Sequence, residues 1–536
     1  MLSFLLCVPS HNLLKFKMGL RVRKKKNQSG SISVQIVDRT NRGYKVVETL
    51  GCSDDETEID KLHQKAILRI NDLSQNLFSK SLDETSEKLL LKKLLSKLTT
   101  QDFIPIGDEL IFGKIFNNIG CNNLFNNVKS IRKQEDKNFL FKSLVISRLL
   151  YPGSKLELIN YLSYFKNIDI TSDKIYRFLD TLYQDEIKSR IETCVFEHTK
   201  KVMNGEIIVT FYDVTTLYFE ASSEDDLRKV GFSKDGKFTK PQIILGLLTS
   251  LEGYPLGFEI HEGNCYEGKT FIPMLEKFQK KFNIEKPIVV ADSGLLSKAN
   301  ILELEKLNYR YILGARIKSS SSEIKNKIVS LNLNDEKNIE TIYFSKNQKM
   351  IVSYSQQRAK KDRYTRTKNY EKLKIKIKSG NLTKAHLNNK GYNKYLVLSD
   401  SQTTISIDED KYNYDSSFDG LKGFVTNDFS LNPTQIIEHY TNLWHIERAF
   451  RISKTDLKIR PIYHRLEHRI YSHILISFVA YTVYKEFDRK LKINNISIKR
   501  KNAIGFIKSM YGIVHDNEIS LLELSPEQEQ IYKLFY

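Results

Sequence analysis

Short apolar runs between Gly205 and about residue 318 constrain the fold of this chain more than any other feature. EIIVTFYDVTTLYF, QIILGLLTSLEGYPLGFEI, PIVVADSG and YRYILGAR are rich in β-branched and aromatic residues, and the helical patterns FIPMLEKFQKKF and KANILELEKL separate the last three. This order predicts a mixed α/β core. With 536 residues, 40% of them apolar, the chain is long enough to bury several cores and is not a disordered polypeptide.

Changes of pattern divide the rest of the chain. Residues 21–50 begin with a basic run and continue as two alternating stretches around RTNRG, which predicts a β-hairpin. Apolar residues three and four apart predict helices from 56 to 204. We therefore expect a basic N-terminal β unit (1–55), a helical region (56–204), an α/β core in two parts (205–318 and 421–485), a β-rich insertion (319–420) and a helical tail (486–536).

The net charge of +20, from 84 Lys and Arg against 64 Asp and Glu, has two explanations. A polyanionic partner is one, and an AT-rich genome, which favours Lys, Asn and Ile, is the other. The five cysteines are odd in number and form no CxxC pair, which favours a reducing cytoplasm. The apolar opening MLSFLLCV and the run from Ile474 to Tyr484 are too short to cross a bilayer, so we expect no membrane role; Met18 is a candidate start.

Two carboxylates stand at the ends of hydrophobic runs. Asp213 closes IIVTFYD and Asp292 closes PIVVAD, at the edge of an α/β sheet where ligands bind. A single Asp at a strand end is more often a turn or helix cap, so a third partner matters. The candidate is Glu447, in a long helix predicted from Thr434 onward. Because carboxylates repel one another, such a cluster needs a divalent cation, and oxygen ligands favour magnesium or manganese.

The predicted Glu447 helix has an unusual polar stripe. Tyr440, Glu447 and Lys454 are each seven residues apart and share one face, because seven residues drift by only about 20° on an α-helix. Arg451 lies on the same face, and Trp444, the only Trp of the chain, lies one turn before Glu447. The stripe fits a third carboxylate for the metal site, or a ladder of salt bridges on a solvated face.

Several of these segments together resemble a known family. DVTTLYFE, GFSKDGK, GNCYEGKT, VVADSGLLS, YILGARIK and YTNLWHIERAFRISKTDLKIRPIYHR are similar to the DDE transposases of bacterial insertion sequences, in the insertion-sequence-four superfamily, from about Gly19 to the 480s. The resemblance implies an RNase H-like core interrupted by a mostly β insertion. It also implies that Asp213, Asp292 and Glu447 are the catalytic triad and hold two Mg²⁺ or Mn²⁺ ions. The spacings of 79 and 155 residues fit the interrupted core.

The resemblance further implies DNA cleavage at transposon ends and transfer of the freed 3′-OH to target DNA by two-metal phosphoryl transfer. The resemblance then implies double-stranded DNA as the partner, a homodimer in a synaptic complex as the assembly and the cytoplasm as the location. It also implies that the helical region 56–204 binds DNA. The family has an Arg on the Glu helix where this chain has Leu443. We expect DNA contacts from the Glu helix and from the N-terminal basic run: Tyr440, Lys454, Arg451, Arg448, Trp444, Arg21, Arg23, Lys24 and Lys25.

A nucleotide-binding ATPase is the main alternative. GNCYEGKT fits the phosphate-loop pattern, with Lys269 and Thr270 as nucleotide ligands, and IVVAD, ending at Asp292, follows as a Walker-B-like run. Against this interpretation, Glu267 would place a carboxylate near the phosphates of the nucleotide. The alternative also leaves the Glu447 stripe unexplained.

Three weaker patterns remain open. HRLEH, residues 464–468, fits a zinc-peptidase pattern but has no evident third ligand. The basic run from Arg358 to Arg366 is either solvated charge or a further phosphate contact. Leu443 favours a further alternative, a non-catalytic DNA-binding remnant of a transposase.

Overall fold

The computed structural model describes residues 20–38, 44–79, 98–126, 130–283, 285–295, 297–380, 382–398, 404–515 and 518–536, together with Lys92 and Ser96. The expectations about the apolar opening and Met18 lie outside these residues. The chain divides into two compact units: the first runs to Ile104 and includes Tyr511–Leu522, and the second contains Pro105–Met510 and Glu523–Tyr536. The six-part division of the sequence stays a prediction.

The first unit contains a three-stranded antiparallel sheet: β1 (Leu20–Lys26), β2 (Ile32–Asp38) and β3 (Lys45–Ser53). β2, the central strand, pairs antiparallel with β3 and also with β1, which contains the basic run. Helix α1 (Glu56–Ser79) packs on the sheet, where Val34, Ile36, Ile59 and Ala66 form a small buried core.

The helical region of the second unit follows the predicted spacing. Its helices are α4 (Ile131–Leu150), α5 (Lys155–Lys166), α6 (Ser172–Leu182) and α7 (Asp185–Val202). α6 begins at the N-cap Thr171 and buries Ile175, Phe178, Leu179 and Leu182, the positions that an amphipathic helix turns to one side. The predicted helix near residue 108 begins as a π-helix, Asp108–Gly113, and continues as α3 (Lys114–Asn118).

The α/β core is an eight-stranded sheet in the order β10-β11-β14-β9-β8-β5-β6-β7. The predicted strands are β5 (Val209–Tyr218), β6 (Gln242–Ser250), β7 (Pro255–Glu262), β8 (Ile288–Ala291) and β9 (Tyr311–Ala315), with α8 (Phe271–Phe282) and α9 (Lys298–Lys306) between the last three. β8 is parallel to both β5 and β9, whereas β6 is antiparallel to β5 and β7. The mixed α/β prediction is confirmed.

The insertion differs from the β-rich segment that the sequence predicted. Beyond β9 the central sheet continues with β14 (Leu421–Thr426), which follows the insertion in the chain, and then with two strands of the insertion, β11 (Gln348–Tyr354) and β10 (Ile339–Ser345). The rest is mainly helical, and a single helix, α11 (Gln356–Lys378), contains the whole basic run. Most side chains of α11 are exposed, so its sequence has little of the apolar spacing from which a helix is predicted. The remaining elements are α10 (Ser322–Ser330), α12 (Glu409–Ser416), β12 (Leu396–Leu398) and β13 (Ile405–Ile407).

The C-terminal part is helical with one exception. α15 (Glu467–Ile493) is buried along most of its length and packs against α4, α6 and α7, which explains why its sequence is apolar on every face. After α16 (Arg500–Lys508), a hairpin of β15 (Tyr511–His515) and β16 (Glu518–Leu521) pairs with β4 (Phe103–Pro105), and α17 (Pro526–Tyr532) follows. The expectation of an all-helical tail was wrong here.

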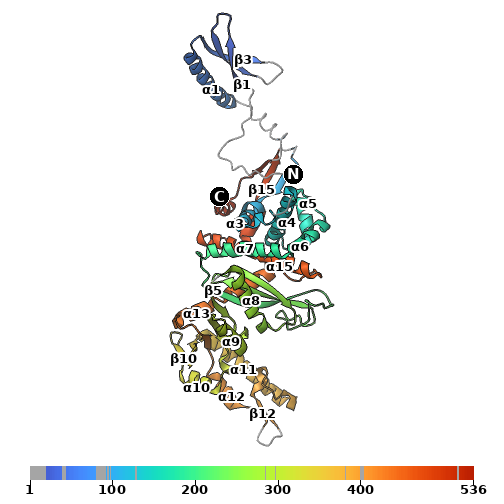
Figure 1. The fold of residues 1–536 in the computed structure, drawn as a ribbon, viewed down its shortest axis with the longest axis vertical. Helices are drawn as coiled ribbons and strands as arrows, with labels where there is room; N and C mark the ends of the chain where they lie inside the picture. The colour runs from blue at the N-terminus through green and yellow to red at the C-terminus, as the bar shows by residue number, and fades with distance from the viewer. Residues whose placement is uncertain are drawn as a thin grey trace. The chain divides into compact units, whose positions relative to one another are not determined.

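Figure 1 shows the helices α4–α7 and α15 gathered at one end of the second unit and the insertion helices α10–α12 at the other, with the sheet between them. Across the described residues, no helix has the length and apolar character that a bilayer span requires. The cysteines of the described part are free.

Candidate active site

Asp213 and Asp292 lie next to one another on two parallel strands. Asp292 follows the carboxyl end of β8, whereas Asp213 lies in the middle of β5, so the prediction that Asp213 closes its strand was wrong. In the pairing of β5 with β8, Tyr212 is opposite Ala291, and partners differ by 79 in residue number. Asp213 and Asp292 also differ by 79, so they are the next pair in the register. Because successive side chains alternate and Tyr212 and Ala291 belong to the buried core, the Asp213 carboxylate points away from that core. The carboxyl end of β8, which Asp292 follows, is the kind of sheet edge at which ligands bind in α/β folds.

The surroundings of Asp213 disfavour its negative charge. Burial raises the pKa of Asp213 to about 6, and the charges of Asp292 and Glu267 act in the same direction. The Lys234 ammonium, 3.7 Å from Oδ1, and the backbone N–H of Val214, which donates to Oδ1 at 2.8 Å, oppose this rise. A carboxylate that is half-buried among other acids keeps its charge only with a cation nearby.

Lys234 and Glu267 are site residues that the sequence analysis did not assign. Lys234 Nζ lies 3.2 Å from Glu267 and donates to the Val214 carbonyl at 2.6 Å. Lys234 belongs to GFSKDGK and Glu267 to GNCYEGKT, two polar segments that precede β6 and follow β7. Their only signal in the sequence was membership of the segments that carry the family resemblance.

Asp292 follows β8 directly and is exposed. Its Oδ1 accepts hydrogen bonds from the Ser293 backbone N–H at 2.6 Å and from Tyr440 Oη at 3.3 Å. Gly314 of β9 makes room for the tyrosine, because a Cβ there would lie 2.3 Å from Tyr440 Oη. Burial and the Asp292 charge raise the pKa of Tyr440, so its hydroxyl keeps the proton that it donates.

The helix predicted from Thr434 onward is in fact two helices. α13 (Pro433–Thr441) carries Tyr440, and α14 (Trp444–Thr455) carries Glu447. The break lies at Asn442 and Leu443, and Leu443 is buried, so the residue at the family's Arg position packs inside the protein. The shared helix face predicted from the seven-residue spacing therefore applies only to Glu447 and Lys454, which both lie on α14. The Glu447 charge nevertheless acts on Tyr440: burial, Asp292 and Glu447 all raise the pKa of this tyrosine.

Lys422 of β14 is a further site residue that the sequence-based prediction did not include. Its ammonium group interacts electrostatically with both Asp292 and Glu447. Burial lowers the pKa of Lys422 and the Arg358 charge lowers it too, whereas Asp292 and Glu447 oppose them. The Lys422 ammonium lies 4.7 Å from the centroid of the Tyr440 ring. A lysine inside the otherwise apolar strand LKGFVT was the available sequence signal. Arg358 brings the first turn of α11 near this site.

Lys454 is engaged inside the protein. Its Nζ donates to both carboxylate oxygens of Asp235 at 3.2 Å, and Arg460 Nε lies 3.4 Å from the same carboxylate. Asp235 directly follows Lys234, so the GFSKDGK segment contacts both Asp213 and Lys454. In this arrangement Lys454 is not available to a DNA phosphate.

The other candidate DNA contacts on α14 differ in accessibility. Trp444 is 42% exposed and stacks on His445 with ring centroids 3.9 Å apart, and Arg451 is exposed. Arg448 is half-buried, lies over the Trp444 ring and is 3.7 Å from Asp488. Trp444 and Arg451 are therefore accessible, whereas Arg448 is partly committed.

The N-terminal candidates lie on β1 of the first unit. Arg21, Lys24 and Lys25 are exposed, and Lys24 pairs with Asp60 at 2.9 Å. Arg23 is half-buried and lies 4.1 Å over the Tyr44 ring. This strand presents positive charge to solvent.

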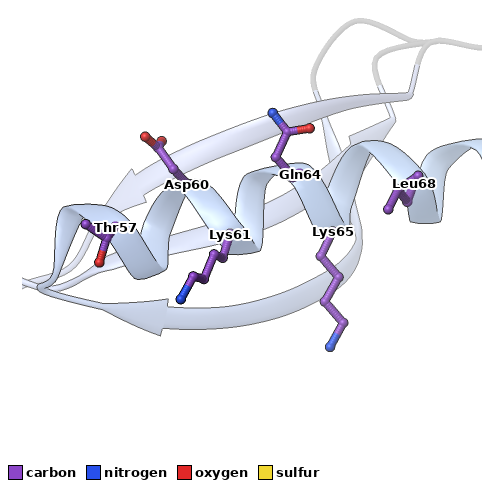
Figure 2. A pocket seen from close by; sticks show the side chains of 6 residues that line it. All are labelled: Thr57, Asp60, Lys61, Gln64, Lys65 and Leu68. Carbon is purple, nitrogen blue, oxygen red and sulfur yellow. The ribbon is translucent and has the colours of Figure 1, made fainter.

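A hollow on α1 is unrelated to the acidic residues described above. Figure 2 shows the six side chains that line it, all from this one helix: Thr57, Asp60, Lys61, Gln64, Lys65 and Leu68. Lys61 and Lys65 extend to the same side of the helix in Figure 2, and Leu68 is 66% exposed. The hollow is an open helix face and contains none of the three candidate catalytic acids.

The phosphate-loop alternative finds no support in the fold. Thr270, its expected metal and nucleotide ligand, is buried and hydrogen-bonded to Tyr212 Oη and to the Glu267 carbonyl, both at 2.7 Å. Lys269 is exposed. The loop follows β7, the sheet's edge strand, and brings the carboxylate of Glu267 to Lys234 and Asp213, where it would repel a nucleotide phosphate. The HRLEH alternative also fails, because α15 begins only at Glu467 and no cluster of metal-ligating side chains occurs within the described ranges.

The three acids fit a hard divalent cation in chemical type. Asp213, Asp292 and Glu447 offer only oxygen ligands, and the raised pKa of Asp213 reflects a site short of positive charge. In the described part of the chain, no three His, Cys, Asp or Glu side chains are grouped closely enough to hold a metal ion. The ammonium groups of Lys234 and Lys422 supply the positive charge in this arrangement.

Comparison with known proteins identifies the family. The family described as "Transposase DDE domain" matches residues 204–483, just over half of the chain. The chain belongs to this transposase DDE family. The match extends from before β5 to within α15 and includes the three candidate acids, so the predicted resemblance to DDE transposases is confirmed at this level.

Curated proteins give no match to this chain. Among solved structures, it is similar to the piggyBac transposase in a synaptic complex with hairpin DNA, at 10% identity and a TM-score of 0.37, over 76% of this chain and 79% of that one. It is also similar to the Mos1 transposase in a paired-end complex with the left transposon end, at 10% identity and a TM-score of 0.15, over 36% and 57% of the two chains.

Proposed function

We propose that this transposase-family chain binds the terminal inverted repeats of an insertion sequence, cleaves the DNA at those ends and joins the 3′-OH to target DNA. The observation that carries the proposal is the parallel register of β5 and β8, which makes Asp213 and Asp292 neighbours, with Tyr440 linking Asp292 to the helix pair of Glu447. Two carboxylates and a third nearby are the ligands that metal-assisted phosphoryl transfer needs.

We further propose an RNase H-like core of the insertion-sequence-four type. Support comes from the strand order β7-β6-β5-β8-β9, in which three consecutive antiparallel strands adjoin two that run parallel to the first of them. Tyr440, Glu447 and Lys454 match the signature of that superfamily, and buried Leu443 departs from it.

In this proposal Asp213, Asp292 and Glu447 would hold two Mg²⁺ or Mn²⁺ ions, whose chemistry would be activation of the attacking water or hydroxyl and stabilisation of the leaving 3′ oxygen. Tyr440 orients Asp292 through its hydrogen bond. Lys234 balances the charge of Asp213 while the site lacks metal.

Duplex DNA is the proposed partner, bound as transposon end and as target by a homodimer in the cytoplasm. Exposed Trp444 and Arg451 beside Glu447 would contact the DNA near the cleavage site, and the basic strand β1 would contact phosphates elsewhere. Lys454 would join them once Asp235 releases it.

The test is cleavage of a duplex that carries the inverted repeats bordering the gene. Asp213→Asn, Asp292→Asn and Glu447→Gln should each lower the cleavage rate by about 10³-fold or more, since losing about 4 kcal/mol of transition-state stabilisation has that effect. Binding of the same duplex should stay within a few-fold of wild type. Glu438→Gln, an exposed acid on α13, is the matched control and should cleave normally. Normal cleavage by a folded triad variant would remove that residue from the active site.

The two alternative functions predict different outcomes in the same assay. A non-catalytic remnant would bind the ends without cleaving them in Mg²⁺. A nucleotide-dependent enzyme would need ATP and would lose its turnover on Lys269→Ala, whereas we expect cleavage without nucleotide.

A further inference from the structure

Two cations are buried together in the helical part of the second unit. Arg148, in the last turn of α4, is 5% exposed, and Lys155, the first residue of α5, is 7% exposed. Both face the same atom, Nδ1 of His473 on α15: Arg148 Nη2 lies 3.2 Å from it and Lys155 Nζ lies 3.1 Å from it. The two cationic nitrogens are thus within about 6.3 Å of each other, the sum of the two distances.

The histidine can satisfy only one of these cations. His473 Nε2 lies 2.8 Å from the carbonyl oxygen of Ile459, which can only accept, so Nε2 carries the proton of the ring. Burial and the charges of Lys155 and Arg148 lower the pKa of His473 well below its ordinary value, so the ring is neutral. Its Nδ1 then offers a single lone pair, for which two charged donors compete.

No acid forms an ion pair with Arg148 or Lys155 in the described part of the chain, and Glu157, the acid in the first turn of α5, accepts from the Ser154 backbone N–H. Among the described residues, no carboxylate contributes to the shifted pKa values of Arg148 and Lys155, which burial lowers in both cases. Arg148 Nη1 donates to the Lys458 carbonyl at 3.4 Å. His464 lies 5.5 Å from His473 between ring centroids and is itself kept neutral, since burial and the same two cations lower its pKa to about 3.

The nearby Arg469 does not change this balance. Its guanidinium pairs with Asp180 through Nε at 2.7 Å, so that acid is already neutralised. His468 pairs with the same carboxylate at 3.0 Å. The net charge facing Arg148 and Lys155 therefore stays positive.

We propose that Arg148 and Lys155 form a binding site for a phosphate-type oxyanion. A buried cation without a counter-charge is costly, and an oxyanion beside both donors would supply the missing charge and acceptors. A tetrahedral oxyanion accepts from a guanidinium fork and from an ammonium at once. The ligand is either free phosphate or a phosphodiester of bound DNA.

This site lies outside the proposed catalytic machinery, because Arg148, Lys155 and His473 are not among the residues assigned to the active site or to α14. The segment after α14 links the two sites in the chain. The carbonyls of Lys458 and Ile459, shortly after the end of α14, contact Arg148 and His473 respectively.

The first test is titration calorimetry of the full chain with inorganic phosphate at constant ionic strength. Wild type should bind one phosphate, Lys155→Met should bind at least tenfold more weakly, and Lys155→Arg should restore binding to within a few-fold. Lys133→Gln, an exposed cation on α4, removes the same charge and should leave affinity unchanged within twofold. Equal binding by wild type and Lys155→Met would show an adventitious ion only and overturn the proposal.

Thermal unfolding separates an anion site from a structural network. If Lys155 is an uncompensated charge, Lys155→Met should unfold in chloride at the same temperature as wild type or higher, and should lose the upward shift that phosphate gives wild type. A Lys155→Met variant that unfolds at a lower temperature by the same amount with and without phosphate would refute the proposal.

A duplex competitor identifies the source of the phosphate. If a DNA phosphodiester occupies the site, a short duplex should displace phosphate, and Lys155→Met should reduce the salt dependence of DNA binding by about one phosphate contact. If free phosphate is the ligand, phosphate and duplex should bind independently. Both results support the site, whereas absence of phosphate binding to wild type together with unchanged DNA binding in Lys155→Met would overturn it.

Discussion

Replacing Asp213 by Asn should stabilise the protein at neutral pH. The pKa of Asp213 is about 6 in the folded chain, compared with 3.8 for an aspartate without such surroundings, and its side chain is only 23% exposed. Because the folded state binds this proton more tightly than the unfolded state, the stabilisation is complete below pH 3.8 and is lost as pH rises through 6. The difference corresponds to about 3 kcal/mol, at 1.36 kcal/mol per pKa unit.

Asn cannot ionise, so Asp213→Asn should be more stable than wild type by up to about 3 kcal/mol at pH 7 and similar to it at pH 4. Lys234 does not become unpaired in this variant, because Glu267 lies 3.2 Å away. The assay is urea unfolding in chelator between pH 4 and 7.5. Trp444, the only Trp of the chain, reports on the second unit through its fluorescence.

The control is Asp226→Asn, an exposed acid between β5 and β6, which should change the unfolding free energy by less than about 0.5 kcal/mol at every pH. The reasoning would be refuted if Asp213→Asn and wild type had parallel profiles of unfolding free energy against pH. Equal profiles would mean that burial does not perturb this carboxylate.

Three further predictions concern neighbouring residues. Gly314→Ala should destabilise the protein by about 1–3 kcal/mol through its contact with Tyr440 Oη, and by clearly less in a Tyr440→Phe background; equal costs in a double-mutant cycle would contradict the contact. Asp235→Asn should release Lys454, strengthen binding to an end duplex and steepen its salt dependence by about one phosphate contact; unchanged binding would show that Lys454 stays unavailable. Mg²⁺ at ten times its dissociation constant should stabilise wild type by about 1.4 kcal/mol at pH 7 but leave the Asp213→Asn variant little affected, and equal stabilisation of both would argue against a metal at this carboxylate.

Segments with a strong periodic pattern were predictable because burial on one side, or on both, leaves a regular apolar spacing. The five strands β5 to β9 and helices such as α6 agree with that spacing. The basic helix α11 and the hairpin β15–β16 were missed because exposed or short elements leave little pattern. The single helix predicted around Glu447 became two because apolar spacing continues across the break at Leu443, which is buried.

The candidate site was predictable only in part. Asp213, Asp292 and Glu447 were chosen from strand ends and from the family resemblance, and the phosphate-loop alternative used the same stretch of sequence that in the structure supplies Glu267. Lys234 and Lys422 had no periodic signal, because a single lysine near a strand looks the same in sequence whether it faces solvent or an acid.

By itself, the sequence determined that an α/β core would form, since apolar runs of strand length fold into buried strands, and it placed Asp292 correctly at the end of one of them. That β5 continues past Asp213 to Tyr218 was decided by its pairing with β6. Only the tertiary structure decided that the spacing of 79 residues equals the β5–β8 register and makes the two aspartates neighbours. It also decided which cations meet them, because Lys234, Lys422 and Tyr440 come from separate loops, strands and helices. Charges that are distant in sequence interact strongly only when folding removes the water between them.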